Sequence, residues 1–315
     1  MASAPAEIVV VGSCMTDLVS YAPRLPRVGE TVHGHRFAVG FGGKGANQCV
    51  QAARLGASTA MVAKVGKDTF GDNYIQNFKD NGVNIDHVGQ VSEAATGVAP
   101  ITVDDEGRNA IVIVPGANLS LGPEDVALAR AAIAGARVVL SQLEVRPETT
   151  AQALRLARQH GVRTILNPAP AVPDLDPELY ELSDIFCPNE TEAELLTGVV
   201  VSGVEEAGRA ATLLLERGCG AVVITLGRRG AVVASRSDPS PRHVPSPSVT
   251  AVDTTGAGDS FVGSLAFFQA RLPGLPLAEA ARRACHIAAE SVRSAGTQSS
   301  YPARAALPAA LFQEQ

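Results

Sequence analysis

This 315-residue chain contains no tryptophan, and aromatic residues make up only 4% of it. Its core must therefore be built mainly from aliphatic side chains and alanine. Hydrophobic residues account for 46% of the sequence and charged residues for 18%, which excludes an intrinsically disordered protein. A chain of this length and composition can bury a large core as one α/β domain with an appendage.

The sequence also lacks basic runs and long apolar stretches. Its net charge is −6, so a nucleic acid is not expected as a partner. We find no stretch of about 18 apolar residues and no basic segment followed by an apolar one at the N-terminus. We therefore expect a soluble, cytoplasmic protein.

Cysteine is scarce, and its pattern excludes two kinds of site. The sequence has five cysteines, an odd number, and they are widely spaced with no C-x-x-C pair. Neither a disulfide framework nor a zinc site is expected, and reduced thiols are predicted. The five are Cys14, Cys49, Cys187, Cys219 and Cys285.

Short apolar runs alternate with helical patterns along most of the chain. The first run, EIVVVG, ends in glycine and is typical of a buried parallel strand. This alternation predicts an α/β fold with a mostly parallel central sheet and helices on both faces, formed by residues 1–315 as a single domain. The predicted strands lie at 7–12, 59–64, 137–142, 163–167, 184–187 and 221–226, the helices at 123–134, 147–160 and 204–217, and a proline-rich surface connection at 235–248.

Two regions break this rhythm. Residues 32–41 alternate between apolar and polar side chains, and 97–103 and 109–114 form two strand-like runs around a turn, DDEGR. Alternating strands suit a small sheet with only one face covered by the main core. We predict a β lid formed by about residues 15–41 and 97–114. Edge strands of the main sheet are the alternative.

Polar residues lie at or beyond the carboxyl ends of five of the predicted strands. In an open parallel sheet, ligands bind beyond the carboxyl ends of the strands. Each of these residues alone could simply cap a helix or face solvent. Their shared position indicates a binding site. They are Asp17, Glu144, Asn167, Asn189 with Glu190 and Glu192, and Thr225 with Gly227.

The segment GFGGKG, residues 40–45, matches the pattern G-x-G-x-x-G. It is weak evidence for a dinucleotide site, because it does not open a βαβ unit, and Gly45 follows Lys44 where a Walker loop requires Ser or Thr. In the helix that should follow, Lys44 and Asn47 share one face and can donate to hydroxyl groups. Gly43 lets a ligand approach the backbone. A turn followed by an amphipathic surface helix is the alternative.

A second glycine-rich segment, VDTTGAGDSF at residues 252–261, precedes a helix predicted over 258–270. Free N–H groups and the macrodipole at a helix N-terminus form an anion site. Gly256 and Gly258 let the backbone wrap around a phosphate oxygen. The carboxylate of Asp259 could stabilise the helix end, but it is also placed where a base for an acceptor hydroxyl belongs.

These motifs resemble the signatures of the pfkB-type carbohydrate kinases. DTTGAGDSFVG is similar to the C-terminal signature of that family and GFGGKGANQ to the N-terminal one, and the resemblance runs from Ile8 to about Pro302. NPAPA and PNETEAE, which lie between them, look most like the family members that phosphorylate ribose. The resemblance implies ATP-dependent phosphorylation of D-ribose at its 5-hydroxyl, with Mg²⁺ and K⁺ as cofactors. It also implies a homodimer formed through the β lid.

The resemblance assigns roles around the reacting groups. Asp259 would be the catalytic base. The backbone amides of Gly256, Ala257 and Gly258 would form the anion hole for the γ-phosphate. The sugar hydroxyls would be bound by Asp17, Gly43, Lys44, Asn47 and Glu144.

It also assigns roles at the nucleotide and cation sites. Asn189 and Glu192 would support Mg²⁺ and phosphate through water, and Thr225 and Gly227 would line the ATP site. Oxygen-only ligation suits a hard cation such as K⁺. The K⁺ ligands would be Asp253, Thr255, Ser291, Ser294, Gly296 and Ser300.

One departure from the family pattern concerns the sugar. Met15 stands where bacterial members often carry Asn, and a thioether cannot donate a hydrogen bond. Related kinases acting on 2-deoxyribose, fructose or a nucleoside therefore remain alternatives. Outside this family, a sugar- or nucleotide-binding regulator and a Rossmann oxidoreductase are the competing hypotheses.

Overall fold

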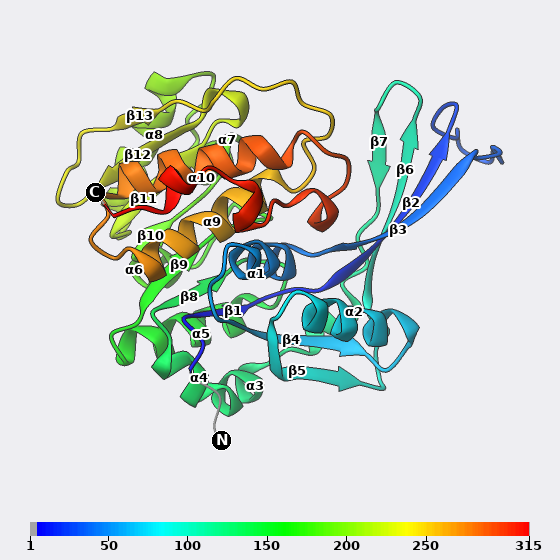
Figure 1. Ribbon diagram of the computed structural model, residues 1–315, viewed down its shortest axis with the longest axis horizontal. Coiled ribbons are helices and arrows are strands. Elements are labelled where there is room, and N and C mark those ends of the chain that lie inside the picture. The colour runs from blue at the N-terminus through cyan, green and yellow to red at the C-terminus, as the bar shows by residue number, and fades with distance from the viewer. Residues whose placement is uncertain (1–4, 315) are drawn as a thin grey trace.

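The computed structural model describes residues 5–314. Its main sheet has nine strands in the order β13-β12-β11-β10-β9-β8-β1-β4-β5, and helices cover both faces (Figure 1). The parallel strands are β1 (Ile8–Val11), β4 (Thr59–Gly66), β5 (Asn84–Val91), β8 (Val138–Ser141), β9 (Arg163–Leu166), β10 (Ile185–Phe186) and β11 (Ala221–Thr225), and β12 (Ala231–Ser235) and β13 (Arg242–Val244) add antiparallel pairs at one edge.

The central strand β1 shows why both faces must be covered. Its sequence, IVVV, is fully buried. Successive side chains of a strand point to opposite faces, so Ile8 and Val10 enter one apolar cluster while Val9 and Val11 enter the other. The predicted α/β fold with helices on both faces is confirmed.

Each apolar cluster is closed by its own set of helices. One face carries α1 (Lys44–Arg54), α2 (Thr69–Asp80), α9 (Ala257–Arg271) and α10 (Leu277–Ser291). The other carries α3 (Pro123–Leu128), α4 (Arg130–Gly135), α5 (Pro147–Gln159), α6 (Pro177–Glu181), α7 (Glu190–Thr197) and α8 (Val204–Glu216). No helix in residues 5–314 is long and apolar enough to span a bilayer.

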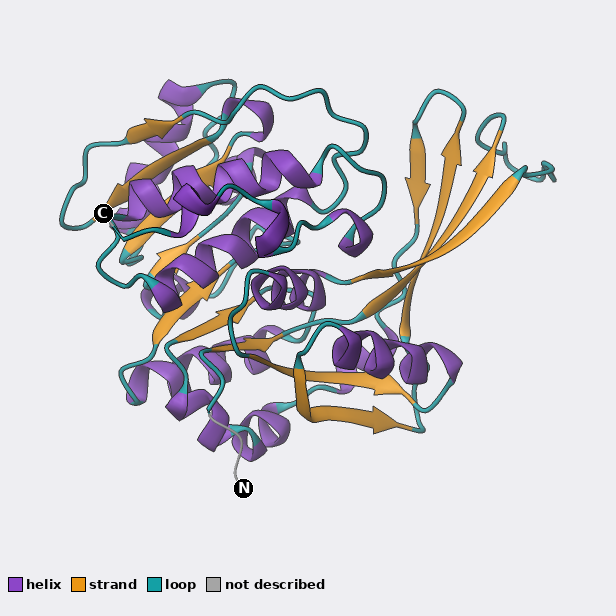
Figure 2. Ribbon diagram, in the orientation of Figure 1, coloured by secondary structure: helices purple, strands orange, loops and turns teal. Residues whose placement is uncertain are grey.

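Four further strands form a second, separate sheet in the order β3-β2-β6-β7. It projects from the body to the right in Figure 2. The alternative of edge strands on the main sheet is thereby excluded. The strands are β2 (Met15–Ala22), β3 (Arg36–Gly42), β6 (Gly97–Asp104) and β7 (Asn109–Ile111).

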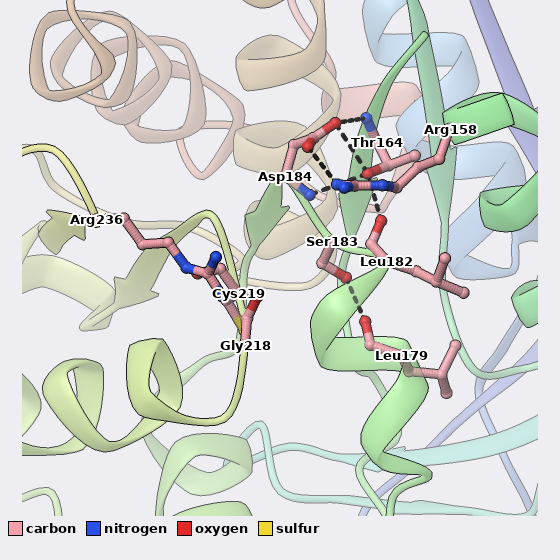
Figure 3. Close-up of polar contacts among 9 residues, drawn as sticks. All are labelled: Arg158, Thr164, Leu179, Leu182, Ser183, Asp184, Gly218, Cys219 and Arg236. Atoms are coloured by element: carbon pink, nitrogen blue, oxygen red, sulfur yellow. Dashed lines mark hydrogen bonds and ion pairs between the residues drawn. The ribbon is translucent and has the colours of Figure 1, made fainter. Parts of the chain in front are cut away.

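The short strand β10 is held in register by side chains as well as by its ladder. Asp184, just before β10, accepts from the Thr164 N–H at 2.8 Å and from Arg158 at 2.7 Å. Thr164 Oγ1 donates to the Leu182 carbonyl at 2.6 Å, and Figure 3 shows these contacts together. They fix where β10 begins, and hence where Asn189 emerges beyond its carboxyl end.

Two predicted elements differ in the structure. The helix expected over 123–134 is divided at Ala129, although the Ala129 N–H still donates to the Asp125 carbonyl at 3.1 Å. The surface connection expected over 235–248 contains β13. Its prolines lie on either side of Arg242–Val244, and an edge strand tolerates such neighbours because one side of its backbone needs no partner.

Candidate active site

A polar cavity of about 200 Å³ opens at the carboxyl edge of the main sheet. Residues from β11, α1, α7 and α9, and from the segments that follow β9 and β10, meet there, although they are far apart in sequence. The cavity therefore brings together eight of the residues that the sequence assigned to a binding site. The cavity is lined by Lys44, Asn167, Ala169, Cys187, Asn189, Glu192, Thr225, Gly256, Gly258, Asp259 and Val262.

The turn into α1 is fixed by a glycine and a distant carboxylate. Gly43 has φ of 86°, a region that favours glycine, and a Cβ there would lie 2.8 Å from the Met15 nitrogen. Glu144 Oε2 accepts from Ser13 Oγ at 2.6 Å and from the Lys44 N–H at 2.8 Å. One oxygen of Glu144, a predicted sugar ligand, thus orients the start of α1.

Asp17 lies on β2, directly opposite Gly40 of β3. A Cβ on Gly42 would come within 2.4 Å of its Oδ1, so only glycine admits the carboxylate here. Burial, together with the nearby carboxylates of Glu144 and Asp259, raises the pKa of Asp17 to about 6. A carboxylate that loses water on burial gains from hydroxyl donors, as a sugar would provide.

Lys44 supplies the positive charge of the cavity. Burial lowers the pKa of its ammonium, but the carboxylates of Asp259, Glu144 and Glu192 outweigh that effect and hold the pKa above its ordinary value. The side chain is therefore charged at neutral pH. It can balance an anionic ligand.

The loop before α9 has the shape of an anion site. Gly256 has φ of 75°, and a Cβ there would lie 2.5 Å from Thr297 Cγ2. The N–H groups of Gly256 and Gly258 donate to no other group in the described chain, whereas the Ala257 N–H donates to the Thr254 carbonyl at 3.2 Å. Two free donors thus stand at the N-terminus of a long helix, where the macrodipole favours negative charge.

Asp259 lies in the first turn of α9 and is only 8% exposed. Its Oδ1 accepts from Gln48 Nε2 at 2.9 Å and its Oδ2 from Asn47 Nδ2 at 2.9 Å. Both oxygens are therefore oriented by amide donors. Sequence reasoning missed Gln48, although it lies one turn after Lys44 and so shares the face of Lys44.

Asn189 and Glu192 form a capping box at the start of α7. The Asn189 N–H donates to Glu192 Oε2, and the Glu192 N–H donates to Asn189 Oδ1, both at 2.8 Å. Burial raises the pKa of Glu192. Thr225 pairs with Asn189 across a parallel bridge, whereas Gly227 begins a separate turn outside the cavity lining.

The predicted K⁺ ligands are only partly brought together. Asp253 Oδ1 accepts from the Thr255 N–H and its Oδ2 from the Gly296 N–H, both at 2.9 Å, so the two segments meet. Ser291 and Ser300 donate to the carbonyls of Ala288 and Thr297, and Ser294 is exposed. Among residues 5–314, no cluster of three His, Cys, Asp or Glu side chains could hold a metal ion.

Comparisons with known proteins agree over nearly the whole chain. The model of the pfkB family of carbohydrate kinases matches residues 5–304. The ribokinase of Mus musculus is 58% identical over 307 residues, which cover 98% of this chain and 95% of that protein. The deoxyribokinase of Salmonella typhi is 41% identical over 296 residues, covering 94% and 95%.

Solved structures give the same picture. The ribokinase of Giardia lamblia superposes with a TM-score of 0.87 at 34% identity, covering 95% of this chain and 98% of that one. The structure of Arabidopsis thaliana ribokinase complexed with ribose and ATP matches with a TM-score of 0.87 at 31% identity, covering 96% and 97%.

Proposed function

Because this chain belongs to the pfkB family of carbohydrate kinases, we propose that it transfers the γ-phosphoryl group of ATP to the 5-hydroxyl of D-ribose, giving ribose 5-phosphate and ADP. The observation that carries this proposal is the placement of Asp259. It is a buried carboxylate held by two amides beside the free N–H groups of Gly256 and Gly258. A base next to an anion site is what phosphoryl transfer to a hydroxyl requires.

The reaction follows from this arrangement. Asp259 accepts the proton of the 5-hydroxyl as its oxygen bonds to the γ-phosphorus and the bond to the ADP oxygen breaks. The N–H groups of Gly256 and Gly258, with the Ala257 backbone between them, stabilise the charge on the transferred group. Asp17, Gly43, Lys44, Asn47 and Glu144 position the sugar, and Thr225 and Gly227 line the ATP site. The ammonium group of Lys44 also balances the charge of the phosphates.

Two cations belong to the proposal. Mg²⁺ would enter with ATP and neutralise phosphate charge, and Asn189 and Glu192 would support it through water. Glu192 lines the cavity, and only its Oε2 is engaged by the described chain. K⁺ would be held next to the anion site, because the Asp253–Gly296 contact joins the two segments that carry its oxygen ligands. Those ligands would be Asp253, Thr255, Ser291, Ser294, Gly296 and Ser300.

Two findings favour 2-deoxyribose as a second candidate sugar. A deoxyribokinase is 41% identical over 94% of the chain, and Met15 is buried beside the Gly42 backbone without a hydrogen-bonding group to offer a 2-hydroxyl. The decisive experiment measures ADP release from Mg-ATP with ribose, 2-deoxyribose, fructose, adenosine or no sugar, each with and without K⁺. Fast, K⁺-dependent turnover on ribose is expected. Preference for another sugar would reject the ribose assignment, and a rate indifferent to K⁺ would reject the cation site.

Sugar binding should weaken in mild acid. The pKa of Asp17 is raised to about 6 by burial and by Glu144 and Asp259, so its carboxylate gains a proton as the pH falls through that value and then accepts hydroxyl donors poorly. The KM for ribose should rise about tenfold between pH 7 and pH 5. In Asp17→Asn, KM should be high throughout and insensitive to pH. An unchanged KM at pH 5 in the unmodified protein would contradict the role of Asp17.

The small sheet supports the proposal of a lid that pairs with a second copy. Large apolar side chains are exposed to solvent on this sheet and on the residues directly after β7. Phe37 is 62% exposed and Val112 is 63% exposed. An exposed apolar patch of this kind commonly marks a protein interface. Light scattering at micromolar concentration should report a dimer, and Phe37→Asp with Val112→Asp should yield a monomer. A monomeric unmodified protein would contradict the proposal.

The five cysteines are all buried as free thiols in the structure. Free thiols are typical of a reducing compartment. They support a cytoplasmic location as part of the proposed function.

A further inference from the structure

A chain of side chains connects a distant arginine to Asp259. Starting from the carboxylate, Asn47 Nδ2 donates to Asp259 Oδ2, and Gln298 Nε2 donates to Asn47 Oδ1, both at 2.9 Å. Asn77 Nδ2 donates to Gln298 Oε1 at 2.9 Å. Asn81 Nδ2 donates to Asn77 Oδ1 at 3.3 Å, and Arg54 Nε donates to Asn81 Oδ1 at 2.8 Å. We call this series of five residues the amide relay. Its members, in order toward Asp259, are Arg54, Asn81, Asn77, Gln298 and Asn47.

Every hydrogen bond of the amide relay points the same way, and its two ends dictate that direction. An ionised carboxylate only accepts, so Asn47 must turn its NH₂ group to Asp259 and its oxygen to Gln298. A guanidinium only donates, so Asn81 must turn its oxygen to Arg54. Amides aligned head to tail between a fixed cation and a carboxylate polarise one another, and each bond strengthens the next.

We propose that Gln298 is a positioning residue of the phosphoryl-transfer site: acting through Asn47, it orients the carboxylate of Asp259. This inference rests on the proposed function. It adds a residue far from the catalytic loop in sequence, whose side chain forms hydrogen bonds within the described chain to Asn47, Tyr74 and Asn77 and not to the base itself.

Gln298 is buried, and every polar atom of its side chain has a hydrogen-bond partner. It is 3% exposed, and its Nε2 also donates to the Tyr74 hydroxyl at 3.0 Å, so its amide has a partner at each position. Its backbone oxygen accepts from Arg54. Because Gln298 lies between Gly296 and Ser300, the segment proposed to carry K⁺ ligands also carries the residue that orients Asn47.

Asp259 is held from its other side by a shorter series of the same kind. Gln142 Nε2 donates to Gln48 Oε1 at 2.5 Å, and Gln48 Nε2 donates to Asp259 Oδ1 at 2.9 Å. The charged or titratable groups near Asp259 are Asp17 from β2, Lys44 from α1, Glu192 from α7 and Tyr301 from the C-terminal segment. Of these, Lys44 alone is a cation, so the orientation of the two Asp259 oxygens depends on the amide donors of Asn47 and Gln48.

The test compares two replacements of Gln298 of similar length. Gln298→Met removes the donor, and kcat should fall about tenfold, the effect of losing support for a charged group. Gln298→Glu can only accept when ionised. Asn47 would then turn its NH₂ group to residue 298 and its oxygen to Asp259, which opposes the ionised base. Asp259 would thereby lose the donor that orients its Oδ2. We expect kcat to fall further than in Gln298→Met, by about 100-fold, while the KM for ATP stays unchanged.

The measurement is kcat and the KM for ATP at saturating ribose and pH 8, where Asp17, whose pKa is about 6, is ionised. The midpoint of thermal unfolding shows whether each variant is folded at the assay temperature. Gln159→Glu is the matched control, because Gln159 ends α5 on the surface and adds the same charge far from the site. Its kcat should equal that of the unmodified enzyme. Asn77→Asp, at a half-buried position one step further out, should lower kcat in the same way even if the Gln298 variants fold poorly.

Two outcomes separate this inference from the proposed function. If the unmodified protein phosphorylates ribose but kcat is unchanged in Gln298→Glu and Asn77→Asp at a temperature where both are folded, Gln298 is only structural and the inference is wrong. If instead no sugar is phosphorylated by the unmodified protein, the proposed function itself fails.

Discussion

Replacing Asp259 with Asn is expected to lower kcat at least about 100-fold, the low end of the effect of losing a general base. An amide has the size of the carboxylate but cannot take the proton of the attacking hydroxyl. The KM for ATP should change little, because the Gly256 and Gly258 donors remain. Steady-state kinetics with ribose, Mg-ATP and K⁺ measure both constants.

The Asp259→Asn variant must be shown to fold. The introduced amide would present its NH₂ group to one of two donors, Asn47 Nδ2 or Gln48 Nε2, that now bond to the carboxylate. Leaving a buried donor without a partner costs about 1–3 kcal/mol of unfolding free energy, which a domain of this size tolerates. Thermal unfolding should therefore remain cooperative at a lower midpoint. Turnover close to that of the unmodified protein would reject Asp259 as the base.

Gly258→Asp should reduce kcat/KM for ATP by at least about 100-fold, comparable to the loss of an oxyanion donor. A Cβ at Gly258 meets no atom within 4 Å, so the new side chain finds room. Its harm would be electrostatic, because a second carboxylate would stand where the transferred phosphoryl group must bind. Steady-state kinetics with varied ATP measure the loss.

The same open space supplies a control. Gly258→Ala adds a methyl group without charge and should keep kcat/KM for ATP within about tenfold of the unmodified protein. Gly256→Ala differs, because its Cβ would lie 2.5 Å from Thr297 Cγ2 at a positive φ. Normal ATP kinetics in Gly258→Asp would contradict the anion site, and a severe loss in Gly258→Ala would point to backbone geometry as the cause.

The amino-acid sequence by itself determined the fold class and the family. The alternation of apolar runs with helical patterns predicted the parallel sheet, and the structure and comparisons confirm it. The prediction of a sugar kinase is likewise confirmed. The motifs behind this prediction are local in the sequence. The anion loop and Asp259 lie within DTTGAGDS, and the Asn189–Glu192 capping box spans one helical turn. The individual roles of the site residues stay predictions until the variants are measured.

Only the tertiary structure decided which partners these local groups would find. Gln48 reaches Asp259 across 211 residues, Gln298 reaches Asn47 across 251, and Ser13 reaches Glu144 across 131. An amide side chain can donate or accept in almost any setting, so its type and spacing do not reveal its partner. Strand β13 was not predicted for a related reason. The formation of a three-residue edge strand depends on pairing with its neighbour β12 more than on its own sequence. Hydrogen-bond partners far apart in the chain are chosen by packing, and packing exists only in the folded molecule.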